Sequence, residues 1–496
     1  MDYLFHGVIQ VFQPVTLVYL IMGVLGGVIF GAIPGLTVAL GVTLMLPFTY
    51  SMTTGQSISM LMGIYVGGIS GGLVASVLLN IPGTPASLVT TFDGAPMARQ
   101  GRAAQALSLG VFASLIGGII SAAALCMIAP QLAKVALMFG SWEYFAMGIM
   151  GLSVVVALSS KNMIKGFISV IIGMLIAMIG LDPISAIPRF TFGFWQLNAG
   201  CDQLATLMGL FALSEVLSQI NGVHQSREIR EVGKVKLLPQ KQDVAGKLRQ
   251  FLSGSVIGTV VGILPGVGQA TASLLSYNQA RQTSKDPDSF GKGNPDGIIA
   301  SESANNACCG GALIPMLTLG IPGDQVTAIL IGGLVIHGLQ PGPLLFTTSG
   351  DIVGTVFVSY IVSCVAMYFI MLLLMKVLIK VLKVPMNYLL PIILVMCMIG
   401  AFTSNNRIFD CWVLLLVGLM SYILTKCEFP LAPLVLGYVL GPTIETNLSL
   451  AIIASKGSIL PLASRPIALG LLLMGLAMLL WPTIKSVIQK QKRKNL

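Results

Sequence analysis

The sequence predicts an all-α, polytopic integral membrane protein of about 12 spans, and three observations carry this prediction. The 496 residues are 55% hydrophobic and only 9% charged, whereas soluble globular domains have about 25% charged residues. The stretches 3–92, 103–133 and 353–375 contain no Asp, Glu, Lys or Arg. A transmembrane helix needs about 20 mainly apolar residues, so several helices fit end to end in these stretches.

Apolar segments follow one another along most of the chain. Several are shorter than the roughly 17 residues that span a bilayer, which predicts half-spans or re-entrant hairpins among them. The segments are 13–33, 36–50, 57–80, 103–130, 143–159, 164–181, 203–221, 251–268, 298–320, 325–347, 352–382, 388–402, 408–425, 430–453 and 466–484.

The basic residues predict the orientation in the membrane. The formal net charge is +10, but Lys and Arg gather in short loops and at the end of the chain, as on the cytoplasmic side of membrane proteins. We therefore expect a cytoplasmic C-terminus, a periplasmic N-terminus and the lipid bilayer as surroundings. No basic face with interleaved aromatic residues is present, so no nucleic-acid partner is expected.

A basic loop near the middle divides the chain. The predicted organisation is a first transmembrane half at 1–220, a cytoplasmic basic linker at 221–250, a second transmembrane half with the C-terminal helices at 251–484, and a basic cytoplasmic tail at 485–496. The sequence lacks the Gly-Lys-Ser/Thr motif of a phosphate loop. Its cysteines and histidines form no metal-ligand pattern. No cofactor is predicted, and no metal other than sodium.

An internal repeat is the strongest feature. Gly-Ala-Ile-Pro-Gly-Leu-Thr at 31–37 matches Gly-Ile-Leu-Pro-Gly-Val-Gly at 262–268, and Asn-Ile-Pro-Gly-Thr at 80–84 matches Gly-Ile-Pro-Gly-Asp at 320–324. The first pair of prolines is 231 residues apart and the second pair 240. The basic loop precedes the second half, while no basic residue precedes the first, so the two repeats are predicted to be inverted. Inverted repeats with broken helices are typical of secondary transporters.

The four Pro-Gly motifs predict a substrate site. Proline removes a backbone donor, and a broken helix is tolerated in a membrane only inside protein or beside a water-filled cavity. The freed N–H groups at helix N-termini suit a carboxylate. Ordinary helix kinks are the alternative. The predicted substrate-binding residues are Gly35, Thr37, Asn80, Gly83, Thr84, Gly266, Gly268, Ser301, Asn305, Asn306 and Gly323.

Three carboxylates near the motifs are candidates for the coupling ion, sodium or a proton: Asp93, Glu302 and Asp324. Solvated loop ends are the alternative for each. For the polar run 301–306, the alternative is helix capping by Ser301 or Ser303.

At these motifs the sequence resembles the large membrane subunit of the tripartite tricarboxylate transporters, of the TctA type. The matching stretches are 31–37, 80–87, 91–102, 262–268 and 301–324, and the likeness extends from about residue 15 to about residue 440. The resemblance implies a bacterial inner-membrane protein that works with a small four-helix membrane subunit and a periplasmic solute-binding protein. It also implies carboxylate uptake driven by a sodium or proton gradient.

The predicted function is therefore import of tricarboxylates or related carboxylates by secondary transport. A passive channel or scaffold subunit is the main alternative. An intramembrane enzyme is a weaker one, because it needs a nucleophile and a base within hydrogen-bond reach and the three histidines are far apart in the sequence. We predict no catalytic residue.

Overall fold

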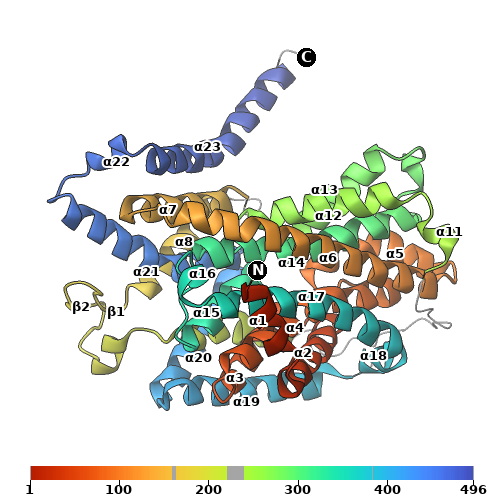
Figure 1. The fold of residues 1–496 in the computed structure, drawn as a ribbon, viewed down its shortest axis with the longest axis horizontal. Coiled ribbons are helices and arrows are strands. Elements are labelled where there is room, and N and C mark those ends of the chain that lie inside the picture. Colours follow the sequence, from red (N-terminus) through yellow and green to blue (C-terminus); the bar gives the residue numbers. More distant parts are fainter. Residues whose placement is uncertain (1, 159–162, 221–238, 383, 495–496) are drawn as a thin grey trace.

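The computed structural model describes residues 2–158, 163–220, 239–382 and 384–494, which fold mainly into helices (Figure 1). Among these residues, seven helices are long and apolar enough to cross a membrane. They are α2 (Pro14–Ala32), α4 (Thr54–Leu79), α6 (Ala103–Ala136), α17 (Gly350–Leu373), α19 (Met386–Asn405), α20 (Ile408–Lys426) and α21 (Leu431–Ala454). Helices satisfy their own backbone hydrogen bonds, as the bilayer interior requires. The chain is thus a multi-pass helical membrane protein, as predicted.

The other elements connect and surround these helices. In the first third they are α1 (Asp2–Val11), α3 (Val38–Thr49), η1 (Pro85–Ser87), α5 (Thr90–Arg99), α7 (Ser141–Leu158) and α8 (Met163–Ala177). The two-stranded antiparallel hairpin β1 (Gly180–Leu181) and β2 (Pro188–Arg189) follows, then η2 (Trp195–Ala199), α9 (Gln203–Leu207), the π-helical η3 (Met208–Leu213) and α10 (Ser214–Gln219). The second half adds α11 (Lys241–Val244), α12 (Leu248–Ile263), α13 (Gly268–Gln282), η5 (Pro287–Ser289), α14 (Pro295–Leu319), α15 (Gln325–Ile336), α16 (Leu345–Thr348), α18 (Met375–Val381), α22 (Pro461–Ser464) and α23 (Pro466–Lys494).

The first Pro-Gly motif ends α2 and reverses the chain. Three glycines on one face of α2 lie against the backbone of α4, with Gly23 beside Met60, Gly27 beside Ile64 and Gly31 beside Gly68. Because both sets of numbers rise together, α2 and α4 run parallel. Helix α3, which lies between them in the chain, must therefore run back, so the break between α2 and α3 is the tip of a hairpin.

The second half repeats this packing. Gly254, Gly258 and Gly262 of α12 lie against the backbone of α14, beside Ala300, Ala304 and Cys308 respectively. These contacts are displaced from those of α2 and α4 by 231 and 240 residues, the same displacements as between the Pro-Gly motifs. Helices α12 and α14 are parallel, and α13 returns between them.

The long helices of the two halves run antiparallel to each other. Ser70 of α4 donates a hydrogen bond to Asn306 Oδ1 of α14, with 2.6 Å between the oxygens. Leu61, earlier in α4, shares a small apolar cavity with Met316, which comes later in α14. The numbering along α4 therefore falls as that along α14 rises.

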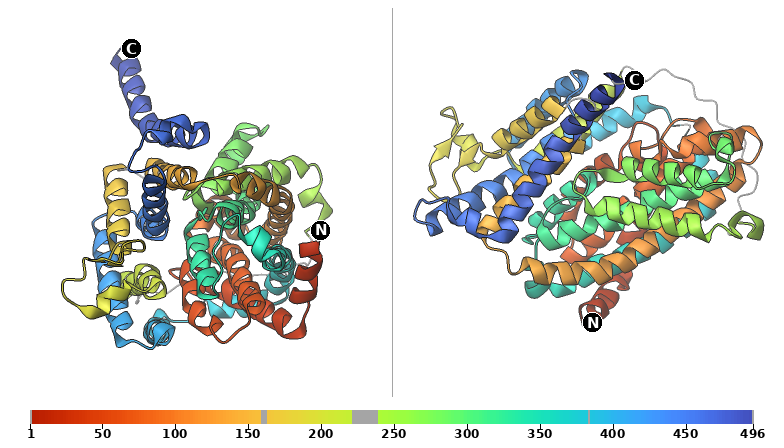
Figure 2. Two further views of the ribbon diagram at one scale, coloured as in Figure 1. Left: turned by 60° about the vertical axis from the view of Figure 1, so that its left-hand side comes forward. Right: turned by 90° about the horizontal axis from the view of Figure 1, so that it is seen from above.

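The later helices α7, α8, α21 and α23 lie beside this core (Figure 2). Gly173 and Gly437 bring α8 and α21 into backbone contact, and α21 reaches the centre of the molecule. The hairpin β1–β2 lies in the connection between α8 and α9. Its Arg189 binds Glu445 of α21 and Asp182. The Asp182 carboxylate accepts hydrogen bonds from the N–H groups of Ile184 and Ser185.

Several helix boundaries differ from the predicted segments. The predicted segment 352–382 is divided at Leu374 into α17 and α18. The predicted segment 325–347 forms α15 as far as Ile336, turns at Gly338, where φ is +74°, and becomes helical again at Leu345 in α16. Helix α1 was missed because it has only 10 residues. Most of the predicted linker 221–250 and the side chains of the predicted tail 485–496 lie outside the described residues.

Candidate functional site

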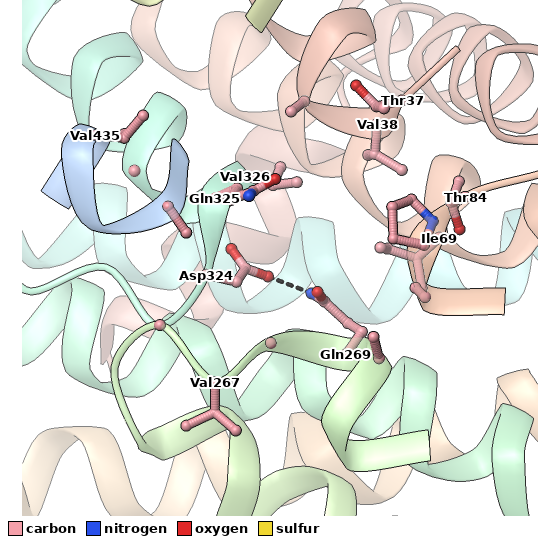
Figure 3. A pocket seen from close by; sticks show the side chains of 18 of the residues that line it. Thr37, Val38, Ile69, Thr84, Val267, Gln269, Asp324, Gln325, Val326 and Val435 are labelled. Carbon is pink, nitrogen blue, oxygen red and sulfur yellow. Dashed lines mark hydrogen bonds between the residues drawn. The ribbon is translucent and has the colours of Figure 1, made fainter. Parts of the chain in front are cut away.

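A cavity of about 200 Å³ lies where the residues after all four Pro-Gly motifs meet (Figure 3). Each motif contributes one wall, and α4 and α21 complete the lining. A cavity of this size can hold a small organic ion. The lining residues are Thr37, Val38, Ala39, Ile69, Thr84, Pro85, Ala86, Gly266, Val267, Gly268, Gln269, Ala270, Asp324, Gln325, Val326, Ala328, Ala432, Val435 and Leu436.

Helix N-termini surround the cavity. Helices α3, α13 and α15 and the short η1 all begin among its lining residues. Their first N–H groups have no partner within the helix and carry the positive end of the helix dipole. Caps occupy some of these donors: Leu40 N–H donates to the Thr37 hydroxyl over 3.1 Å, and Thr327 N–H donates to the Asp324 carboxylate over 2.7 Å. The first-turn donors that no cap occupies are suited to the oxygens of an anion.

One carboxylate, that of Asp324, lies in this cavity. It is 4% exposed and caps α15 through Thr327, whose N–H and hydroxyl both donate to Oδ1 over 2.7 Å. Its Oδ2 accepts hydrogen bonds from the Tyr65 hydroxyl and from the Gln269 amide, which points at it in Figure 3. Among the described residues, no Lys or Arg forms an ion pair with this carboxylate.

Five of the predicted residues line the cavity together: Thr37, Thr84, Gly266, Gly268 and Asp324. The geometry changes what Gly266 contributes, because its N–H donates to the Gly323 carbonyl over 2.8 Å. In this structure the N–H of Gly266 is therefore already occupied. The bond instead ties the first break of the second half to its second break.

The other three glycines, together with Asn80, do not line the cavity. Gly83 packs on the carbonyl of Gly31, and Gly323 packs in the same way on the carbonyl of Gly262. Gly35, with φ of +95°, lies against the amide of Gln219. Gly83 and Gly323 allow the backbones of the breaks to approach one another, since a Cβ at either would meet backbone atoms, whereas a Cβ at Gly35 would meet the Gln219 side chain. Asn80 is exposed and ends α4 in the left-handed conformation, with φ of 56°.

Comparison with known proteins identifies the family of this chain. Residues 17–436 match the family model described as "Tripartite tricarboxylate transporter TctA family". The chain belongs to this family. It is a component of a membrane transporter, and the resemblance predicted from the motifs is confirmed.

Two relatives of this TctA-family chain come from Agrobacterium vitis. An "uncharacterized 52.8 kDa protein in TAR-I ttuC' 3'region" is 34% identical over 483 residues, which are 97% of this chain and 95% of the relative. An "uncharacterized protein in TAR-II ttuC' 3'region" is 35% identical over 234 residues, which are 47% of this chain and 97% of that relative. No solved structure matches the chain.

The polar run 301–306 lies in the interior of α14, away from the helix end. Asn294 caps this helix by accepting from Asp296 N–H over 2.8 Å, and Pro295 is its first residue. Capping by Ser301 or Ser303, the alternative for this run, is therefore wrong, and the pair Asn294-Pro295 was the available signal. The run is buried beside other helices: Asn306 accepts from Ser70, and Glu302 accepts from Thr90 and Ser114.

Asp93 holds a loop in place. Its Oδ1 accepts the N–H groups of Gly291, Gly293 and Asn294 over 2.8–2.9 Å, and its Oδ2 accepts the Tyr277 hydroxyl over 2.8 Å. The three N–H groups join the first-half helix α5 to the loop that precedes α14, and the Tyr277 hydroxyl joins α5 to α13. A solvated loop end is excluded, because Asp93 is buried. Its geometry favours a clamp over an ion site.

Sequence reasoning did not assign a site role to three groups at the cavity. Tyr65 lies in the middle of the uninterrupted helix α4, where nothing in the local sequence sets it apart. Gln269 follows the break at Gly268 and could have been included on that ground. The α21 residues at the cavity are apolar, come more than 100 positions later and have no motif.

Proposed function

We propose that this chain is the translocating subunit of a binding-protein-dependent secondary transporter that imports tricarboxylates or related carboxylates across the bacterial inner membrane. One observation carries the proposal: the breaks of both repeats present helix N-termini to one cavity. A carboxylate in that cavity would accept hydrogen bonds from several backbone N–H groups at once. The Thr37 and Thr84 side chains and the backbone at Gly268 would complete its surroundings.

The two repeats are proposed to have inverted topology and to move against each other. The antiparallel course of α4 and α14 supports this, as does the recurrence of the glycine contacts in both halves. Helix α3 has 12 residues, which span about 18 Å, less than the roughly 30 Å of the hydrocarbon core. The hairpins α2–α3 and α12–α13 are therefore proposed to be re-entrant, within a total of about 12 spans. Alternating access around such a site is the known behaviour of inverted-repeat transporters.

Asp324 is proposed as the link between substrate and coupling ion. Two ionised carboxylates in a small cavity repel each other strongly. A sodium ion or a proton at Asp324 would remove that repulsion when the substrate enters. Binding of the anion and of the cation would then favour each other, which is the requirement for symport.

The chain is proposed to act with the two partners that its family implies, a small four-helix membrane subunit and a periplasmic solute-binding protein. Family membership supports both. In this arrangement the N-terminus is periplasmic and the C-terminus cytoplasmic, in agreement with the basic residues near the end of the chain.

The test is uptake of labelled citrate into vesicles that contain the three proteins, with an imposed sodium gradient, an imposed pH gradient or neither. We expect accumulation that needs one of the gradients and the binding protein. Asp324→Asn should lose the dependence on the gradient. Asp351→Asn, at an exposed position on α17, is the matched control and should keep it. Uptake that follows the citrate gradient alone would support the passive channel instead, and absence of uptake by an assembled complex would reject citrate.

A further inference from the structure

A second buried carboxylate, Glu302, lies outside the cavity. Glu302 is in the interior of α14, its exposed fraction is 0%, and it is not among the cavity-lining residues. Among the described residues it forms no ion pair. A lone carboxylate in such surroundings is costly while it is ionised, so its presence calls for a functional reason.

Hydroxyl groups bind both oxygens of this carboxyl group. The Thr90 hydroxyl lies 2.5 Å from Oε1 and the Ser114 hydroxyl 3.2 Å from Oε2. Both oxygens of the carboxyl group are therefore held by hydrogen bonds from neutral side-chain hydroxyl groups.

An acceptor for the added proton is also present. The Asn305 side chain lies beside the Glu302 carboxyl group, and both its Oδ1 and its Nδ2 are buried without a hydrogen-bond partner among the described residues. Buried, unpaired polar atoms are unfavourable. The amide can donate from Nδ2 to the ionised carboxylate or accept at Oδ1 from the protonated carboxyl group, so it suits both states of Glu302.

Further hydroxyl groups lie around this position. Ser273, one turn after the cavity-lining Gln269 on α13, donates to the Ser301 carbonyl over 3.1 Å. The Ser301 hydroxyl lies 3.2 Å from that of Thr90, which binds Glu302. All of these contacts are with neutral polar groups.

Other titratable groups on the packed elements have their own partners or lie elsewhere on their helices. Asp93 binds Tyr277 and three backbone donors, Asp324 binds Tyr65 and Gln269, and Tyr360 binds Ser121 and Asn306. The remaining groups on α5, α6, α12, α13, α14 and α17 are Arg99, Cys126, Lys134, Arg249, Arg281, Asp296, Cys308, Cys309, Asp351, Cys364 and Tyr368. Glu302 itself is bound by two side-chain hydroxyl groups and forms no ion pair among the described residues.

We propose that Glu302 is a proton-binding site, separate from the substrate cavity, whose carboxyl group is held by the hydroxyl groups of Thr90 and Ser114. This inference rests on the proposed function and deepens it, because it selects the proton as an ion that the transporter carries. Thr90 and Ser114 are positioning residues, which stabilise the ionised form through their hydrogen bonds.

The test uses membranes that contain the full chain and the apolar reagent dicyclohexylcarbodiimide, which modifies protonated carboxyl groups in apolar surroundings. Labelling of Glu302 is followed by mass spectrometry from about pH 5 to pH 9, with and without sodium. We expect labelling that rises as the pH falls, does not respond to sodium, and is lost in Glu302→Gln. Thr90→Val should move half-labelling to a higher pH by about one unit, the equivalent of one hydrogen bond to a charged group.

Ser303→Ala is the matched control. Its hydroxyl is buried next to Glu302 in the sequence and has no hydrogen-bond partner among the described residues, so half-labelling should not move. Protection of Glu302 by sodium would overturn the proposal in favour of a sodium site. Absence of label at every pH, while the detergent-unfolded chain is labelled, would overturn it altogether. Because labelling needs no transport, normal labelling without carboxylate uptake would reject the proposed function and leave the proton site standing.

Discussion

Two neighbouring glycines of α2 provide a matched test of the helix packing. A Cβ at Gly27 would meet the backbone of Ile64 and Gly68, with the Gly68 nitrogen at 2.8 Å. A Cβ at Gly26 would have no atom within 4 Å outside its own helix. Both changes to Ala gain the same helix propensity, about 1 kcal/mol. The difference between Gly27→Ala and Gly26→Ala is therefore the cost of overpacking alone.

We expect this difference to be about 1–3 kcal/mol, the usual cost of an added methyl group in a close-packed interior. The contacts are with backbone atoms, which cannot rotate away as a side chain can, so the upper part of the range is expected. The assay is reversible unfolding of the purified chain in mixed micelles by added sodium dodecyl sulfate. The buried cysteines Cys308 and Cys309 report unfolding through their reaction with a thiol reagent.

The repeat supplies an internal replicate. Gly258, at 231 residues from Gly27, would place a Cβ against the backbone of Ala304, and Gly258→Ala should be destabilising to the same extent. Equal unfolding free energies for Gly26→Ala and Gly27→Ala would refute the close backbone contact between α2 and α4. Destabilisation by Gly27→Ala but not by Gly258→Ala would refute the equivalence of the two hairpins.

Three further predictions concern polar contacts. Asp93→Asn replaces a charged acceptor of three backbone N–H groups. It should speed hydrogen exchange of those amides at least tenfold, since one hydrogen bond to a charged group contributes about 1.5–3 kcal/mol. Unchanged exchange would show that Asp93 does not hold this loop in place. Arg189→Ala and Glu445→Gln should show a coupling of about 1 kcal/mol in a double-mutant cycle of unfolding, because both side chains are about one-fifth exposed; additive effects would show that the pair contributes nothing. The N–H groups of Ser185 and Ile184 hold the pKa of Asp182 below its usual value. The ionised carboxylate therefore stabilises this turn at pH values above the unfolded pKa of about 3.9. That stabilisation is lost as the pH falls through the lower pKa of the folded state. Protection of the Ser185 amide, corrected for intrinsic exchange, should therefore stay constant from pH 7 to about pH 5, and a decline in that interval would contradict the assignment.

Patterns local in the sequence predicted the membrane class and four of the elements that line the cavity. Long uncharged stretches identify membrane helices because charge is costly in lipid, and the Pro-Gly motifs identified the breaks because proline ends a helix. The meeting of Thr37, Thr84, Gly268 and Asp324 could be expected from the repeat, since matching breaks are placed symmetrically in such folds.

What the sequence could not provide depends on contacts between distant segments. Nothing near Tyr65 indicates that its hydroxyl reaches Asp324, 259 residues away. Nothing near Gly266 indicates that its N–H donates to the Gly323 carbonyl, which belongs to a different break. Asp93 is an ion candidate in the sequence because it lies near a Pro-Gly motif. The groups that donate hydrogen bonds to it come about 200 residues later, so they cannot be found from the sequence around Asp93. Backbone partners across such separations leave no local pattern.

The shared construction of the cavity has a consequence for biosynthesis. Thr37 and Thr84 come from the beginning of the chain, while their neighbours Gln269 and Asp324 are made much later. At about 5–20 residues per second, the 232 residues between Thr37 and Gln269 take about 10–50 s to synthesise. During that time the second half is not yet present to pack against the break between α2 and α3. The unpaired backbone N–H and C=O groups of this break must therefore be in contact with the insertion machinery or with water until the second half has been synthesised.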